Sequence, residues 1–385
     1  PRELRGYAEG SLLRDFPIPP VDLTGKRLHI APRAGAEPSE AMLFALRAIP
    51  CSGPRKSSRN LIATNDGHGC ILGYENLRDV YVRSFSPLRD TDFFRMIWGV
   101  YGGGPLTIRA GATAGEIIDR PSDHAYYAYE RRWGAAIDEF KRRGEDVVAA
   151  AVDAAHRIGL EIHLYVRPEA FYRPFPHEAC TVRFFRDHPE WRCRDETGRE
   201  VRRMSYAYPE VQEHMLAYFA ELLDYEAEGL CLAFNRSIPM MICEEPVLAE
   251  FRRRWGRAAR LPDEVDAPEM LEVRHDLLAG FIGRVHELVR GRGKVLSCII
   301  PRDLADVRLR GLDVERSIRA GHFESVMVGG GHGDPQTEIL DELTRLQALG
   351  TRVYSGGSAG GANGAYWLKN DPRLIAERML HLLEA

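Results

Sequence analysis

From residue 59 onward, short runs of aliphatic and β-branched residues alternate with longer stretches in which apolar residues recur every three or four positions. The short runs have the length of buried strands, and the longer stretches have the periodicity of amphipathic helices. This alternation is typical of βα units around a parallel sheet. Seven strands are predicted, at Leu61–Thr64, Phe94–Val100, Glu161–Val166, Leu230–Phe234, Val295–Ile299, Ser325–Val328 and Arg352–Tyr354.

The amphipathic stretches between these strands predict the helices that would cover the sheet. Within Asp146–Ile158 the apolar residues fall on one helical face, and Gly159 follows as a stop before the next strand. Pro209–Asp224 shows the same spacing and leads into the fourth strand. Four more helices are predicted, at Val247–Trp255, Pro268–Arg290, Thr337–Leu349 and Pro372–Glu384.

Successive strand and helix units over residues 59–385 predict an α/β fold of the (β/α)8 TIM-barrel type. A doubly wound sheet would carry a glycine-rich phosphate turn after its first strand, and Gly67-His68-Gly69 is too short to supply one. No strand follows the last predicted helix, so we expect a barrel that is incomplete or irregular at its eighth strand. Residues 1–58 hold one candidate strand, Arg27–Ala31, and one short helix, Ser39–Ala48, and are interpreted as an N-terminal appendage.

Composition excludes several classes of function. The 385 residues include 52 Lys and Arg against 56 Asp and Glu, a formal net charge of -4, so nucleic acid is not an expected partner. The apolar runs fall far short of the roughly 20 residues that span a bilayer, so no integral membrane segment is predicted. Seven cysteines without a CxxC spacing predict neither a disulfide framework nor a structural zinc site. The oligomeric state and the localisation stay open.

Polar residues follow the predicted strands at the end where (β/α)8 barrels build their active sites. Carboxylates, arginines, amides and aromatic rings together suit a polyhydroxylated ligand, because rings stack on aromatic side chains while carboxylates and amides bind hydroxyls. A carbohydrate is therefore the expected substrate, and neither a metal nor another cofactor is predicted. The residues expected to bind it are His68, Trp98, Arg167, Asn235, Arg236, Asp303, His332 and Tyr354. The alternative for Trp98 is core packing between the second strand and a helix, and the alternative for Arg167 and Arg236 is a structural salt bridge at the barrel rim.

Two short segments carry a family resemblance. They are Gly229–Asn235 with Arg236–Pro246, and Gly311-Leu312-Asp313-Val314-Glu315 before the sixth predicted strand. These segments resemble the glycoside-hydrolase-like family 10 proteins and their relatives, and the resemblance covers residues 59–385. It implies a (β/α)8 barrel that acts on glycans. Many relatives carry an Asp three residues before the arginine, in the position of a nucleophile, and this chain has Ala233 there.

Glycoside hydrolysis generally needs two carboxylates that flank the scissile bond. Because Ala233 cannot ionise, the catalytic candidates are Glu245, Glu244, Glu169 and Asp66. Glu245 is predicted to be the essential carboxylate, since the proline after it biases it to an extended conformation, and Glu169 or Asp66 would be the second member. The alternative for the adjacent glutamates is a helix cap. The alternative for Asp66 is an Asn-Asp-Gly turn.

Three functions are compatible with these residues. The leading hypothesis is a glycoside hydrolase that acts on an oligo- or polysaccharide by carboxylate acid/base chemistry. A non-catalytic carbohydrate-binding barrel is the alternative, because Ala233 replaces the acid and the seventh strand ends in Tyr354-Ser355. A metal-dependent hydrolase is the weakest hypothesis, because the first strand lacks a His-x-His pair; its candidates are Asp66, His68, His177 and His332. The sugar, the linkage and the stereochemical outcome stay open.

Overall fold

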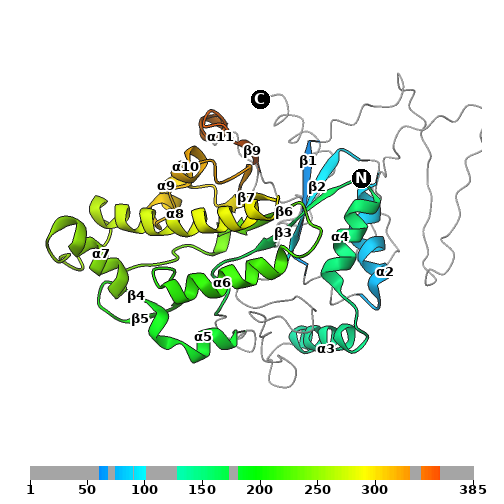
Figure 1. Ribbon diagram of the computed structural model, residues 1–385, viewed down its shortest axis with the longest axis horizontal. Helices are drawn as coiled ribbons and strands as arrows, with labels where there is room; N and C mark the ends of the chain where they lie inside the picture. Colours follow the sequence, from blue (N-terminus) through cyan, green and yellow to red (C-terminus); the bar gives the residue numbers. More distant parts are fainter. Residues whose placement is uncertain are drawn as a thin grey trace, which may run out of the picture. The chain divides into compact units, whose positions relative to one another are not determined.

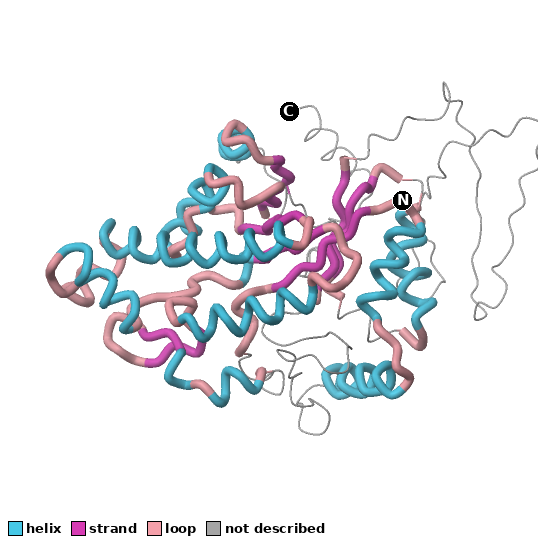
Figure 2. Tube along the Cα trace, viewed as in Figure 1, coloured by secondary structure: helices cyan, strands magenta, loops and turns pink. Residues whose placement is uncertain are grey.

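The computed structural model describes residues 60–67, 74–89, 91–100, 128–172, 181–329 and 340–355. The chain divides into two units, residues 1–60 with 90–92, and residues 61–89 with 93–385. The second unit is built on a parallel sheet flanked by helices (Figure 1, Figure 2). The segments expected at Arg27–Ala31, Ser39–Ala48 and Pro372–Glu384 lie outside the described residues.

All seven predicted strands are confirmed, and each boundary lies within one residue of its prediction. Every neighbouring pair in the sheet is parallel, as the βα pattern requires. In the described part of the chain no eighth strand joins this sheet, and β1 and β9 are its two edges. The order across the sheet is β1 (Leu61–Asn65), β2 (Phe93–Gly99), β3 (Glu161–Val166), β6 (Gly229–Ala233), β7 (Val295–Ile300), β8 (Ser325–Val328) and β9 (Arg352–Ser355).

The sheet curls into a half-barrel. Arg95 of β2 donates a hydrogen bond to Glu324, directly before β8, over 3.0 Å. Three strands separate β2 from β8, so a flat sheet would hold them about 19 Å apart. The inner face encloses an apolar layer made of Ile97, Tyr165, Cys231, Ala233, Ile299 and Met327, with Ile62 and Tyr354 packed against it.

Helices cover the outer face of the sheet. The helices predicted from hydrophobic periodicity are present wherever the structure describes the chain. The helix α4 (Val147–Arg157) begins where the Asp146 carboxylate accepts the backbone N–H groups of Val148 and Ala149. No helix in the described ranges has the length and apolarity needed to cross a bilayer. The other α-helices are α2 (Leu77–Val80), α3 (Ala128–Arg142), α5 (Arg183–Asp187), α6 (Pro209–Leu222), α7 (Glu245–Trp255), α8 (Pro268–Gly291), α9 (Leu304–Leu309), α10 (Val314–Arg319) and α11 (Leu340–Gln347).

An antiparallel hairpin of β4 (Arg192–Arg194) and β5 (Glu200–Met204) lies between β3 and α6 along the chain. Its turn is held by the Asp195 carboxylate, which accepts the N–H groups of Thr197 and Arg199 at 2.9 Å each. The hydrophobic pattern predicts no strand here, because both strands are short and mostly charged. The turn chemistry of Asp-Glu-Thr-Gly was the available signal.

Candidate functional site

Asp66, Tyr165 and Arg167 meet at the C-terminal end of the sheet, and we call them the mouth trio. Asp66 follows β1, Tyr165 lies on the inner face of β3, and Arg167 follows β3. The Tyr165 hydroxyl donates to Asp66 Oδ1, and Arg167 Nη2 donates to the same oxygen over 3.1 Å. Because β2 lies between β1 and β3, the mouth trio bridges two strands that are not neighbours.

Two glycines allow this bridge. A Cβ on Gly99, at the end of β2, would lie 2.4 Å from the Asp66 carbonyl oxygen and 2.9 Å from Tyr165 Cε1. Gly67 has φ +77°, and a Cβ there would lie 2.1 Å from the Gly99 carbonyl oxygen. The Asn65 side chain accepts the Gly67 N–H at 2.9 Å, so the predicted turn forms. The turn and the functional interpretation of Asp66 are therefore compatible.

The exposure of the mouth trio is uneven. The Asp66 side chain is 51% exposed, whereas that of Arg167 is 8% exposed. A cation beside a carboxylate favours its ionised form, and a buried guanidinium with fixed partners holds that carboxylate in one orientation. The mouth trio therefore presents a positioned, accessible carboxylate at the end of the sheet where barrel enzymes bind substrate.

Glu169 and Glu244 form a second group, which we call the buried acid pair. Glu169 Oε1 accepts the backbone N–H of Met204 in the hairpin at 3.0 Å. Burial raises the pKa of Glu169 to about 8, Arg203 opposes the rise, and Glu244 adds to it. Glu169 is therefore protonated at neutral pH.

The Glu244 carboxyl is fully buried. Its Oε2 accepts the backbone N–H of Ile242 at 2.7 Å, and Cys193 and Ser205 lie within hydrogen-bonding reach. Burial raises its pKa as well, against the effect of these donors. Two buried acids with raised pKa values fasten the hairpin to the loops after β3 and β6 and are almost entirely shielded from solvent.

Glu245 occupies a different environment. It begins α7, its side chain is 68% exposed, and it forms an ion pair with Arg252 over 2.5 Å. In Figure 1, α7 lies at the opposite side of the second unit from β1. The structure therefore brings Glu169 and Glu244 together, brings Asp66 to Arg167, and leaves Glu245 on a solvated helix.

The predicted sugar-binding residues are distributed unevenly. Trp98 is 1% exposed and stacks on Phe85 with ring centroids 5.5 Å apart, so it packs in the core behind the sheet and presents no face to a sugar. Asn235 and the exposed Arg236 lie in η5 (Phe234–Arg236), directly after β6. Tyr354 packs against the inner layer.

Asp303 caps a helix at the same end of the sheet. It follows β7, and its carboxylate accepts the Asp306 N–H at 2.9 Å as the N-cap of α9. His68 and His332 lie outside the described residues. Sequence reasoning missed Tyr165, for which the available signal was a hydroxyl-bearing ring two positions before Arg167 in a buried strand.

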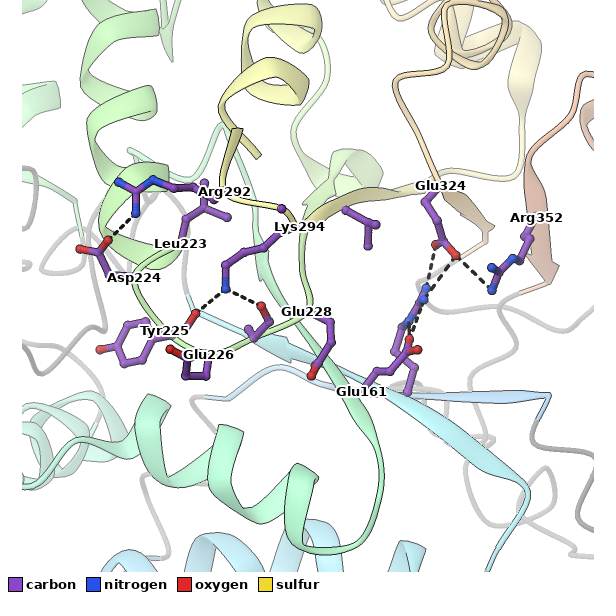
Figure 3. A pocket seen from close by; sticks show the side chains of 14 residues that line it. Glu161, Leu223, Asp224, Tyr225, Glu226, Glu228, Arg292, Lys294, Glu324 and Arg352 are labelled. Carbon is purple, nitrogen blue, oxygen red and sulfur yellow. Dashed lines mark hydrogen bonds and ion pairs between the residues drawn. The ribbon is translucent and has the colours of Figure 1, made fainter. Parts of the chain in front are cut away.

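A cleft of about 750 Å³ opens at the opposite end of the sheet, where the strands begin (Figure 3). Lys294 Nζ donates to the carbonyls of Tyr225 and Ala227 at 2.6 Å each, and Arg292 pairs with Asp224. The N-terminal face of such barrels serves stability. Because the charges here neutralise one another, we interpret this cleft as structural.

Metal ligation finds little support among the candidates that can be placed. In the described ranges no three His, Cys, Asp or Glu side chains gather closely enough to hold a metal ion. Of the metal-hydrolase candidates, Asp66 is engaged by Tyr165 and Arg167, and His68, His177 and His332 lie outside those ranges.

The chain matches no family model and no curated protein. Solved structures that resemble it are glycoside hydrolases. They include α-L-fucosidase isoenzyme 2 from Paenibacillus thiaminolyticus, with TM-score 0.45, 14% identity, and coverage of 82% of this chain and 48% of that chain. The exo-β-N-acetylglucosaminidase from Vibrio harveyi has a TM-score of 0.41 and 9% identity, with coverage of 82% of this chain and 53% of that chain.

The Group IV chitinase of Ostrinia furnacalis gives TM-score 0.40, 10% identity, and coverage of 77% of this chain and 65% of that chain. The present chain therefore spans less than two thirds of each of these three relatives. None of the comparisons shows the glycoside-hydrolase-like family 10 group itself.

Proposed function

We propose that this chain is a glycan-processing barrel of the glycoside hydrolase type, and that Asp66 is its essential carboxylate. The mouth trio carries the proposal. It supplies an accessible carboxylate, held by Tyr165 and Arg167, at the strand ends where (β/α)8 enzymes carry out their chemistry. The family resemblance of residues 59–385 points in the same direction.

The neighbours of Asp66 define its role. Hydrolysis breaks the bond between the anomeric carbon and the leaving oxygen, which takes up a proton, while water adds to the anomeric carbon and loses one. Arg167 favours the ionised form of Asp66. Asp66 therefore acts as the ionised member, as base or nucleophile, and a separate group protonates the leaving oxygen.

The buried acid pair serves this site indirectly. Glu169 holds a proton at neutral pH, but it contacts the hairpin through Met204 and is 8% exposed. We therefore assign it the role of a positioning residue for the loop that carries Arg167. Glu245, on the solvated face of α7, receives no catalytic role in this proposal.

The test is the Asp66→Asn variant, assayed for release of reducing ends from a panel of oligosaccharides. Asn keeps the size of the side chain and removes the ionised carboxylate, so turnover should fall by about 10²–10⁴ while oligosaccharide binding persists. Glu245→Gln is the matched control and should retain wild-type turnover. If Glu245→Gln loses turnover and Asp66→Asn keeps full activity, the essential carboxylate is Glu245 and not Asp66.

A non-catalytic carbohydrate-binding barrel is the second candidate. The observation that favours it is Ala233, whose methyl group lies in the apolar inner layer at the end of β6, where many relatives in the resembling group carry an Asp. In that case the wild type should bind oligosaccharides in calorimetry without releasing reducing ends. Asp66→Asn would then weaken binding, because the carboxylate would accept sugar hydroxyls.

A further inference from the structure

Three adjacent strands of the sheet are each followed by an arginine. Arg167 comes directly after β3, Arg236 ends the turn η5 after β6, and Arg302 lies two residues after β7. Ala233 and Ile299 are register partners, and the second and third arginines each lie three residues beyond them. The chain therefore reaches Arg236 and Arg302 at matching positions past the same end of the sheet, and η5 packs against β7.

Arg302 has an unmet hydrogen-bonding capacity. Its Nη2 is fully buried and has no hydrogen-bond partner within the described part of the chain. A buried polar group without a partner costs about 1–3 kcal/mol, and more when the group is charged. Such a nitrogen is suited to an acceptor that arrives with a ligand.

The carboxyl groups that follow β1, β3 and β7 at this end of the sheet are already engaged or uncharged. Asp66 is engaged by Arg167. Asp303 accepts the first-turn N–H of Asp306. Burial raises the pKa of Glu169 to about 8, so Glu169 adds no negative charge at neutral pH.

We infer that the site takes an anionic glycan, whose carboxylate or sulfate group is bound by Arg302 with Arg236 beside it. A guanidinium offers paired N–H donors that match the two oxygens of a carboxylate or sulfate. An anionic substituent would also supply the acceptor that Arg302 Nη2 lacks. The inference rests on the proposed function, because it names the class of substrate for the same site.

Calorimetric titration with paired probes tests this inference. Oligogalacturonides are compared with their carboxyl-reduced forms, and sulfated heparin oligosaccharides with their desulfated forms. The anionic member of at least one pair should bind at least about tenfold more tightly. The pair that shows the difference identifies the carboxylate or the sulfate as the recognised group.

Variants connect that preference to Arg302. Arg302→Gln should remove most of the preference, so that the anionic probe binds about as tightly as the neutral one. Arg302→Lys keeps the positive charge but lacks the paired N–H donors of the guanidinium, so it should retain part of the preference for anionic probes. Arg310→Gln is the matched control, since Arg310 is exposed near the end of α9 and pairs with Asp306 at 2.7 Å; it should behave as wild type.

Two outcomes would overturn the inference, and they separate it from the proposed function. Neutral probes that bind as tightly as anionic ones, or a charge preference that survives in a folded Arg302→Gln, would reject an anionic substrate while the glycan proposal stands. If no anionic or neutral oligosaccharide is bound or cleaved, both proposals fail. If Arg302→Gln does not fold, the inference is tested by the preference of the wild type for anionic probes and by its partial retention in Arg302→Lys.

Discussion

The mouth trio and the buried acid pair place carboxyl groups in opposite environments, although Arg167 and Glu169 are only two residues apart. Asp66 is half-exposed and paired with a cation. Glu169 is buried, close to a second acid, and its pKa is raised to about 8. The neighbours of a carboxyl that follows a strand of this sheet thus decide whether it is a charged, accessible group or a neutral, buried one.

The two regions are also connected. The Tyr206 hydroxyl donates to the Pro168 carbonyl over 2.5 Å, and the Met204 N–H donates to Glu169 over 3.0 Å. These contacts fasten the loop that begins at Arg167 to the last residue of the hairpin and to the segment after it. The buried acid pair therefore helps to hold the mouth trio in place, and mutations in each group test their separate contributions.

The largest effect is expected from Gly67→Ala, which breaks the mouth trio through the backbone. Its Cβ would meet the Gly99 carbonyl oxygen at 2.1 Å, at a positive φ. We expect the free energy of unfolding to fall by about 3–4 kcal/mol in denaturant titrations. Gly144→Ala is the matched control, because φ is +66° with nothing within 4 Å, and should cost about 1 kcal/mol. Equal losses would mean that the close approach of β1 and β2 is relaxed in solution.

Glu169→Ala should come next, with a loss of about 2–4 kcal/mol at pH 5, because it opens a cavity and leaves the buried Met204 N–H without its acceptor. Asp66→Ala removes a half-exposed carboxylate and should change stability by less than about 1 kcal/mol. Chemical denaturation of both variants measures the two losses in the free energy of unfolding. A larger loss for Asp66→Ala would reverse the roles of the two regions.

The pH dependence of stability should follow the buried acid pair. The unfolded chain releases the Glu169 proton near the ordinary pKa of 4.5, whereas the folded chain retains it to about 8. The contribution of Glu169 to stability is therefore complete below pH 4.5 and is lost as the pH rises to about 8, by at most about 1.4 kcal/mol per pH unit. Glu244, whose pKa is also raised, contributes in the same direction.

Glu169→Gln should flatten that slope, since glutamine mimics the protonated acid and cannot ionise. The groups that face Glu169 are Arg203, Glu244, Tyr206 and Cys193, and their contributions remain. Glu272→Gln, on an exposed position of α8, should keep the wild-type slope. Denaturation midpoints between pH 4.5 and 8 measure both, and identical slopes in wild type and Glu169→Gln would contradict the assignment.

The smallest effect is expected from Glu245→Gln, which breaks the exposed ion pair with Arg252. Surface ion pairs contribute about 0–1 kcal/mol, so thermal unfolding should shift little, and less in high salt. Glu244→Gln, one residue earlier and fully buried, should shift more. A larger effect at Glu245 than at Glu244 would show that α7 is packed differently.

The strands were predictable because each is a short apolar run bounded by polar or glycine residues, such as Glu161–Val166 before Arg167. The hairpin was not, because β4 and β5 alternate charged and buried positions over very few residues. Hydrophobic periodicity carries little information in elements of that length.

The candidate site was predictable in part. Asp66 and Arg167 follow strands, and the parallel sheet brings them together. Trp98 could not be assigned from the pattern, because both faces of β2 are buried and alternation does not distinguish inside from outside. Glu244 and Glu245 differ by one position along the chain, and only the start of α7 decides which is buried.

The reach of Arg95 across the half-barrel has a consequence for biosynthesis. Its partner Glu324 is made 229 residues later, a delay on the order of 10 to 50 seconds at the usual pace of translation. During that time β1, β2 and β3 have no opposite wall, and their apolar inner faces are exposed on the nascent chain. The opposite wall forms only after β8 has been made, and until then the exposed apolar faces are a surface of the kind that ribosome-associated chaperones bind.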